Sequence, residues 1–160
     1  MEEHLFDARE ELKRLEHIIY VSLKYTRTVD VLLNALNRMV STSDLIIRAF
    51  ALKAIEDGKL VALPKSNALT AKRIAAIHED DPILNKYLTF YAFLKNILKL
   101  PFGRRQEYRR HVTHIVKLEN ATSEIKIDNL ENAEKFMHEF LKYSYEKLIG
   151  KLEEDNDEWN

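Results

Sequence analysis

The scarcity of glycine and proline constrains the fold of this chain more than any other feature. Only three glycines and three prolines occur among 160 residues, where average composition would place these two residue types at about 12% of positions. Sheet-rich chains need frequent turns, and those turns draw on Gly, Pro and Asn-Gly pairs. The sequence therefore predicts few, long elements and an all-α fold. The same scarcity excludes Gly-rich phosphate loops of the Walker and Rossmann types.

Composition indicates one globular domain. Hydrophobic residues make up 46% of the chain and charged residues 32%, and the formal net charge is -1. The absence of cysteine excludes disulfides, thiol nucleophiles and Cys-based metal sites, and it fits a reducing compartment. No signal-peptide pattern or membrane-spanning apolar run is present. We expect a cytoplasmic protein without a membrane partner, with one domain over residues 1–150 and an acidic, frayed tail over residues 151–160.

Apolar residues recur at helical spacings of three and four in most of the chain. Ser66 and Asp81 are typical helix caps, and Asp128 with a glutamate three residues later resembles a capping box. Residues 118–127 are polar and are interpreted as a loop or short extended piece. The pattern predicts an antiparallel, up-and-down bundle of four long helices plus shorter ones. The expected helices cover residues 2–25, 28–57, 67–78, 82–99, 104–116 and 128–148.

The charge balance is uneven within residues 104–117. Five Lys or Arg residues stand there against one glutamate, and two histidines lie among them. The basic and imidazole residues are Arg104, Arg105, Arg109, Arg110, Lys117, His111 and His114. On a helix, Tyr108, Val112 and Val116 would face the core, so Arg110 and His114 would be presented at the surface. Such a basic helix attracts anions, although a solvated face with local salt bridges explains the same pattern.

Arginine and histidine together can cleave RNA without a metal ion. A histidine with a pKa near 6.5 can exchange a proton with a ribose hydroxyl or leaving oxygen at neutral pH. An arginine holds the scissile phosphate with two parallel hydrogen bonds and stabilises its developing charge. Arg109 and His114, with four residues between them, could supply the phosphate-binding arginine and the proton-exchanging histidine.

This segment resembles the HEPN superfamily, compact helical bundles with an Arg-x4-6-His motif on a late helix. The resemblance covers about Leu5 to Leu148 and departs in having Arg110 where a small polar residue such as Asn commonly stands. It implies a homodimer in which Arg/His pairs from both subunits meet in one cleft, with metal-independent RNA cleavage in active members. Inactive members bind partners, such as a nucleotidyltransferase or antitoxin.

The spacing alone leaves alternatives open. Arg104 and His111 would share one helix face, so His111 is an alternative base to His114. A metal site at His111 and His114 would lack further ligands, and the neighbouring arginines would repel a cation. The sequence therefore predicts no metal and no cofactor. His4, His17 and His138 are interpreted as ordinary surface or boundary residues. The spacing is matched by Arg73/His78, Arg109/His114, Arg105/His111 and Arg104/His111.

Three functions follow from these observations. The first is a non-catalytic, homodimeric HEPN-like module that binds a partner protein or an RNA or nucleotide phosphate through residues 104–117. The second is a metal-independent endoribonuclease that uses Arg109 as phosphate clamp and His114 or His111 as acid and base. In that hypothesis the alternative catalytic or phosphate-binding residues are Arg104, Arg105, Arg110 and Lys117. The third is a purely structural assembly protein.

Overall fold

The computed structural model describes residues 1–151 and shows a predominantly helical fold with a small antiparallel sheet. The elements are α1 (Glu2–His17), the π-helical turn η1 (Ile18–Ser22), α2 (Leu23–Tyr25), α3 (Val29–Glu56), α4 (Asn67–Ile77), α5 (Pro82–Lys99), β1 (Phe102–Arg105), β2 (Thr113–Lys117), β3 (Thr122–Lys126) and α6 (Ile127–Leu148). Five of the six predicted helical segments are therefore helical, because α1, η1 and α2 together cover the first of them.

Side-chain caps begin three of the helices. Thr28 accepts a hydrogen bond from the N–H of Val31 at the start of α3, and Ser66 accepts one from Leu69 at the start of α4. Asp81 does the same for α5, whose first residue is proline. The caps predicted at Ser66 and Asp81 are thus confirmed, since each satisfies a donor that the helix leaves free. The final helix begins one residue before the predicted Asp128 cap.

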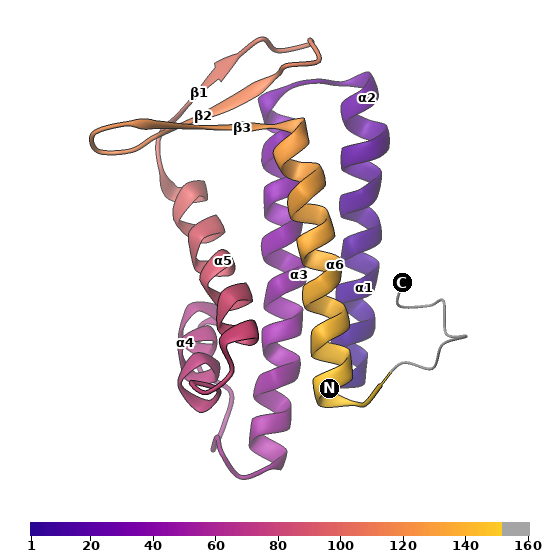
Figure 1. The fold of residues 1–160 in the computed structure, drawn as a ribbon, viewed down its shortest axis with the longest axis vertical. Coiled ribbons are helices and arrows are strands. Elements are labelled where there is room, and N and C mark those ends of the chain that lie inside the picture. The colour runs from indigo at the N-terminus through magenta and orange to yellow at the C-terminus, as the bar shows by residue number, and fades with distance from the viewer. Residues whose placement is uncertain (152–160) are drawn as a thin grey trace.

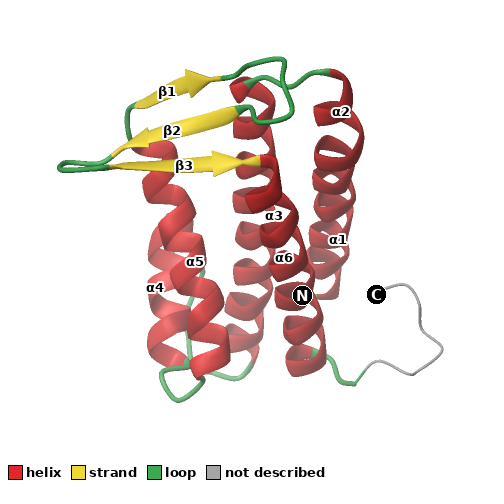
Figure 2. Cartoon of the chain, turned by 45° about the horizontal axis from the view of Figure 1, so that its top comes forward, coloured by secondary structure: helices red, strands yellow, loops and turns green. Residues whose placement is uncertain are grey.

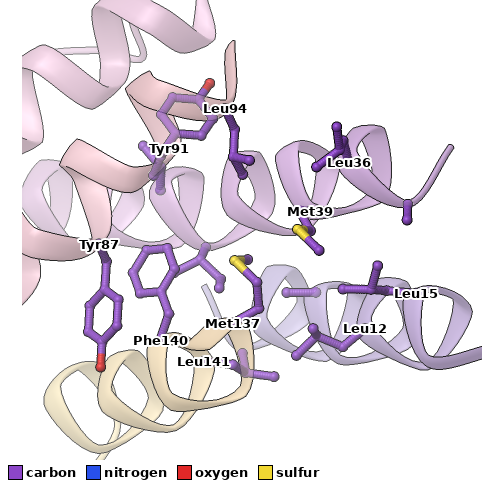
Figure 3. Packing of buried hydrophobic residues seen from close by; sticks show 14 of the residues in the cluster. Leu12, Leu15, Leu36, Met39, Tyr87, Tyr91, Leu94, Met137, Phe140 and Leu141 are labelled. Atoms are coloured by element: carbon purple, nitrogen blue, oxygen red, sulfur yellow. The ribbon is translucent and has the colours of Figure 1, made fainter. Parts of the chain in front are cut away.

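The core forms where α3 packs against its neighbours. α3 contacts α1, α4, α5 and α6, and α1 lies beside α6 on one flank while α4 and α5 lie on the other (Figure 1). The apolar faces of these helices meet in one cluster (Figure 3). Labelled members of this cluster are Leu12 and Leu15 of α1, Leu36 and Met39 of α3, Tyr91 and Leu94 of α5, and Met137 and Phe140 of α6.

The all-α prediction is wrong, because three strands within residues 102–126 form a sheet, although the short extended piece expected within residues 118–127 is confirmed as β3. β2 is the central strand and pairs antiparallel with β1 and β3, and Arg104 lies opposite His114 in the first pairing. The predicted helix over residues 104–116 is absent. Four of the five residues from Val112 to Val116 are β-branched, a composition that favours an extended strand. The sheet lies across the end of the molecule where α3 and α6 begin (Figure 2).

Two further expectations concern the chain's membrane behaviour and its tail. Among residues 1–151, no helix combines the length and the apolar character needed to cross a bilayer. Residues 152–160, which make up nearly all of the predicted acidic tail, lie outside the described residues.

Candidate functional site

The connection between β1 and β2, residues 106–112, is held against the start of α3. The N–H of Tyr108 donates to the carbonyl oxygen of Arg27 at 2.5 Å. The carboxylate of Glu107 accepts a hydrogen bond from the N–H of Val29 at 3.2 Å. Glu107 thereby satisfies a free donor in the first turn of α3, where a negative charge is also stabilised by the helix dipole. These two contacts fix where the basic residues that follow are presented.

Two of the predicted arginines bind carboxylates of their own chain. The guanidinium of Arg104 donates to Asp30 at 3.0 Å and to Glu107 at 3.1 Å. These hydrogen bonds raise the pKa of Arg104. Arg105 pairs with Glu124 of β3 across the sheet. Arg104 connects the sheet to the start of α3, Arg105 connects the two outer strands, and both charges are compensated within the chain.

His114 is buried, so its predicted position at the surface is wrong. His114 is 1% exposed, and neither of its ring nitrogens has a hydrogen-bond partner among the described residues. The ring packs against Phe102 with centroids 4.7 Å apart. Burial lowers the pKa of His114, and the charge of Arg104 lowers it further. The imidazole is therefore neutral and has no access to a ligand, whereas Arg109 is exposed in the connection.

Lys117 also lies apart from the other predicted residues. It ends β2, and its N–H donates to the carbonyl oxygen of Pro101 at 2.8 Å. Five residues of an extended strand span about 16 Å, which places Lys117 far from the connection at the other end of β2. Of the seven predicted residues, Arg110 and His111 line a common cavity.

This cavity has a volume of about 280 Å³ and is named the basic pocket. Three separate segments form it: the end of the first helical segment from η1 to Arg27, the β1–β2 connection, and the first turns of α6. Its lining residues are Ile19, Tyr20, Leu23, Lys24, Arg27, Arg110, His111, Lys126, Ile127, Asp128 and Glu131. Four of them are Lys or Arg and two are acidic, so positive side chains outnumber negative ones in the lining.

Lys126 pairs with Glu124 at 3.7 Å, but the other three cations of the basic pocket are less compensated than Arg104 and Arg105. Within residues 1–151, Lys24, Arg27 and Arg110 form no ion pair, and the Nε atom of Arg27 is buried without a hydrogen-bond partner. The pocket also lies at the N-terminus of the 22-residue helix α6, where backbone N–H groups and the helix dipole favour an anion. Side chains and backbone thus supply positive potential to the same cavity.

The wall and rim of the basic pocket contain two further features. η1 supplies Ile19 and Tyr20, and single π-helical turns inside helices are frequent at functional sites. Three tyrosines at this end of the molecule are unusually exposed: Tyr20 at 49%, Tyr25 at 79% and Tyr108 at 74%. The backbone contact between Tyr108 and Arg27 ties one of them to the pocket wall. Exposed aromatic rings beside cations are a typical platform for unpaired bases.

Sequence reasoning did not identify Lys24, Arg27 or Lys126 as site residues. Lys24 lies in the last turn of the first predicted helix, Arg27 lies in the break that follows it, and Lys126 precedes the last predicted helix. Each therefore lies near a helix end, and helix ends that are far apart in the sequence can meet at one end of a helical fold. Their distance along the chain from Arg110 gave no local pattern that could group them.

Comparison of the chain with protein-family models, with curated proteins and with solved structures finds no match in any of the three. The assignment of a function therefore depends on the geometry and charge of the basic pocket.

Proposed function

We propose that this protein is a non-catalytic helical module that binds a phosphate group of single-stranded RNA or of a nucleotide in the basic pocket. One observation carries the proposal. Arg27, Arg110 and Lys24, from two distant segments, line one cavity at the N-terminus of α6 without ion-pair partners in the described chain. Charge-assisted hydrogen bonds from arginine to phosphate are among the strongest that proteins form.

The pocket's size favours part of a nucleic acid chain over a large cofactor. Its volume of about 280 Å³ lies at the small end of the range of roughly 300 to 1,000 Å³ that is usual for small-molecule sites. A phosphate with its sugar would fill it, and the bases would remain outside. Tyr25 and Tyr108 are exposed at this end of the molecule and offer stacking surfaces for such bases.

The test is equilibrium binding of a fluorescently labelled, single-stranded RNA followed by anisotropy at several salt concentrations. Arg110→Ala should weaken binding about tenfold and reduce the slope of log affinity against log salt by about 0.7, the value for one lost phosphate contact on a single strand. Arg109→Ala is the matched control, because Arg109 is its exposed neighbour and does not line the pocket. Equal effects of the two variants would refute the pocket as the site.

The endoribonuclease remains a second candidate because His111 lines the pocket with Arg110. In this version His111 is the general acid and base, and Arg110 with Arg27 holds the phosphate. Cleavage of labelled RNA in EDTA should then be lost in His111→Ala and in Arg110→Ala. If the wild-type protein leaves the RNA intact, the ribonuclease candidate is removed and the binding proposal stands on the anisotropy data.

The homodimer implied by the HEPN resemblance belongs to this proposal as well. All lining residues of the basic pocket come from one chain, so the pocket does not depend on a second copy. Light scattering coupled to size-exclusion chromatography measures the molecular mass directly. A mass of twice 18.8 kDa would support a cleft shared by two pockets, and a mass of 18.8 kDa would leave each pocket to act alone.

A further inference from the structure

Three side chains that offer metal-ligand atoms meet between α1 and α6. The Nε2 atom of His138 lies 2.5 Å from a carboxylate oxygen of Glu16 and 2.7 Å from one of Glu134. The three ligand atoms all lie within 4.8 Å of one another. Glu134 and His138 are four residues apart and share one face of α6, and Glu16 reaches them from the end of α1.

One of the two carboxylates in this cluster is buried and therefore needs a partner. Glu134 is only 6% exposed, and a buried carboxylate must be paired or must coordinate a cation. In the described chain its partners are His138 and the hydroxyl of Tyr20, which lies 3.4 Å from its second oxygen. No Lys or Arg of residues 1–151 forms an ion pair with Glu16 or Glu134.

Hydrogen bonds within the group compensate the two carboxylates incompletely. The hydroxyl of Tyr20 donates to Glu134 but brings no positive charge. A single ring nitrogen carries at most one hydrogen, so His138 cannot donate a full hydrogen bond to both carboxylates. A positive charge between the two glutamates would stabilise the group.

We propose that Glu16, Glu134 and His138 form a binding site for a divalent transition-metal ion, with Zn²⁺ as the best-fitting ion. One imidazole and two carboxylates are a donor set that Zn²⁺ accepts, and three protein ligands leave one coordination position open. Ligand atoms about 2.1 Å from a tetrahedral ion stand about 3.4 Å apart. The two glutamates therefore need to move away from His138 by less than 1 Å, and the partly exposed Glu16 has room to do so.

This proposal is independent of RNA or nucleotide binding. Tyr20 borders both sites, because it lines the basic pocket and donates to Glu134. Sequence reasoning interpreted His138 as an ordinary residue and assigned no metal. The spacing of Glu134 and His138 is visible in the sequence, but Glu16 is 122 residues from His138 and only the packing of α1 against α6 reveals it.

The experiment is isothermal titration of the full, EDTA-treated and desalted chain with ZnCl₂, repeated with MnCl₂ to compare a harder ion. We expect one Zn²⁺ per chain and weaker binding of Mn²⁺. Glu16→Gln and His138→Gln should each weaken Zn²⁺ binding more than tenfold, since even outer-shell changes cost 10- to 100-fold. Glu131→Gln, which removes a nearby charge without removing a ligand, and His111→Ala should bind as the wild type does.

Two results would overturn the proposal. The absence of Zn²⁺ binding would show that His138 and the two glutamates hold one another without an ion. Binding that survives in both Glu16→Gln and His138→Gln, or that falls equally in Glu131→Gln, would show that the ion is held elsewhere or by charge alone. Glu16 is 41% exposed, so Glu16→Gln tests the ligand without disturbing the core. Circular dichroism of each variant confirms that it is folded before titration.

Discussion

Replacing His114 by leucine should stabilise this protein. A buried polar atom without a hydrogen bond loses the hydrogen bonds to water that it made in the unfolded chain, and no hydrogen bond in the folded protein replaces them. His114 carries two such atoms, Nδ1 and Nε2, in a residue that is 1% exposed. Leucine removes both while filling much of the same space in a strand position.

The magnitude follows from two opposing contributions. Each unsatisfied buried group costs about 1 to 3 kcal/mol, so the lower bound for two ring nitrogens is about 2 kcal/mol. The contact between the His114 and Phe102 rings, 4.7 Å apart, contributes about 1 kcal/mol that leucine loses. The expected net gain is about 1 kcal/mol in the free energy of unfolding, or roughly 2 to 4 °C in Tm for a chain of this size.

The same substitution should weaken the dependence of stability on acid. Burial holds the pKa of His114 below its ordinary value in the folded protein, while the unfolded chain keeps a value near 6.5. As the pH falls below 6.5, the unfolded state takes up the proton first, so stability declines until the pH passes the folded-state pKa. His114→Leu removes this contribution. His4 and His78 also have lowered pKa values, so part of the decline remains.

Urea unfolding followed by far-ultraviolet circular dichroism at pH 7.5 and pH 5.5 measures both effects. The matched control is His17→Leu, because His17 is exposed on α1 and its replacement should change neither value. A His114→Leu variant that is less stable than the wild type at pH 7.5 would refute the reasoning, since the ring nitrogens would then have partners. An unchanged difference between the two pH values would refute the linkage to His114.

Two further predictions concern the helical core. Asp81 caps α5 and accepts hydrogen bonds from Lys147 and Tyr143, and these contacts together lower the pKa of Asp81 to about 2. Asp81→Ala should therefore lower the free energy of unfolding in urea at pH 7 by about 2 to 3 kcal/mol. The wild type should lose about 2 kcal/mol of this as the pH falls from about 4 to 2, and a variant with an equal acid loss would contradict the assignment. Leu36→Ala should cost about 2 to 5 kcal/mol, because Leu36 is 3% exposed in the core, and a smaller loss in chemical unfolding would count against close packing there.

Helices were predictable from the sequence where apolar periodicity and capping residues agreed. α3 to α5 begin and end within one residue of the expected positions, because Thr28, Ser66 and Asp81 supply caps. Residues 104–116 show the limit of periodicity. Tyr108, Val112 and Val116 have helical spacing, yet Tyr108 is 74% exposed while both valines are fully buried. β-branched residues and the docking of the connection on α3 outweighed the helical pattern there.

The candidate sites were predictable only in part, because helix ends and helix faces meet through packing. Arg110 and His111 stand out locally by charge, and the structure places both in the basic pocket. Lys24 and Arg27 gain their role only when the end of the first helical segment meets the start of α6. Periodicity predicts which face of a helix is buried, and it leaves open which helix lies against that face.

The contrast between neighbouring arginines shows that charge along the sequence differs from charge available to a ligand. Arg104 and Arg105 contribute to the basic segment, yet their partners Asp30, Glu107 and Glu124 compensate them in the fold. Removing either one should loosen the sheet and leave the potential of the basic pocket nearly unchanged. The positive potential at the pocket comes instead from side chains that the folding of distant segments leaves without acidic partners, together with the helix dipole of α6.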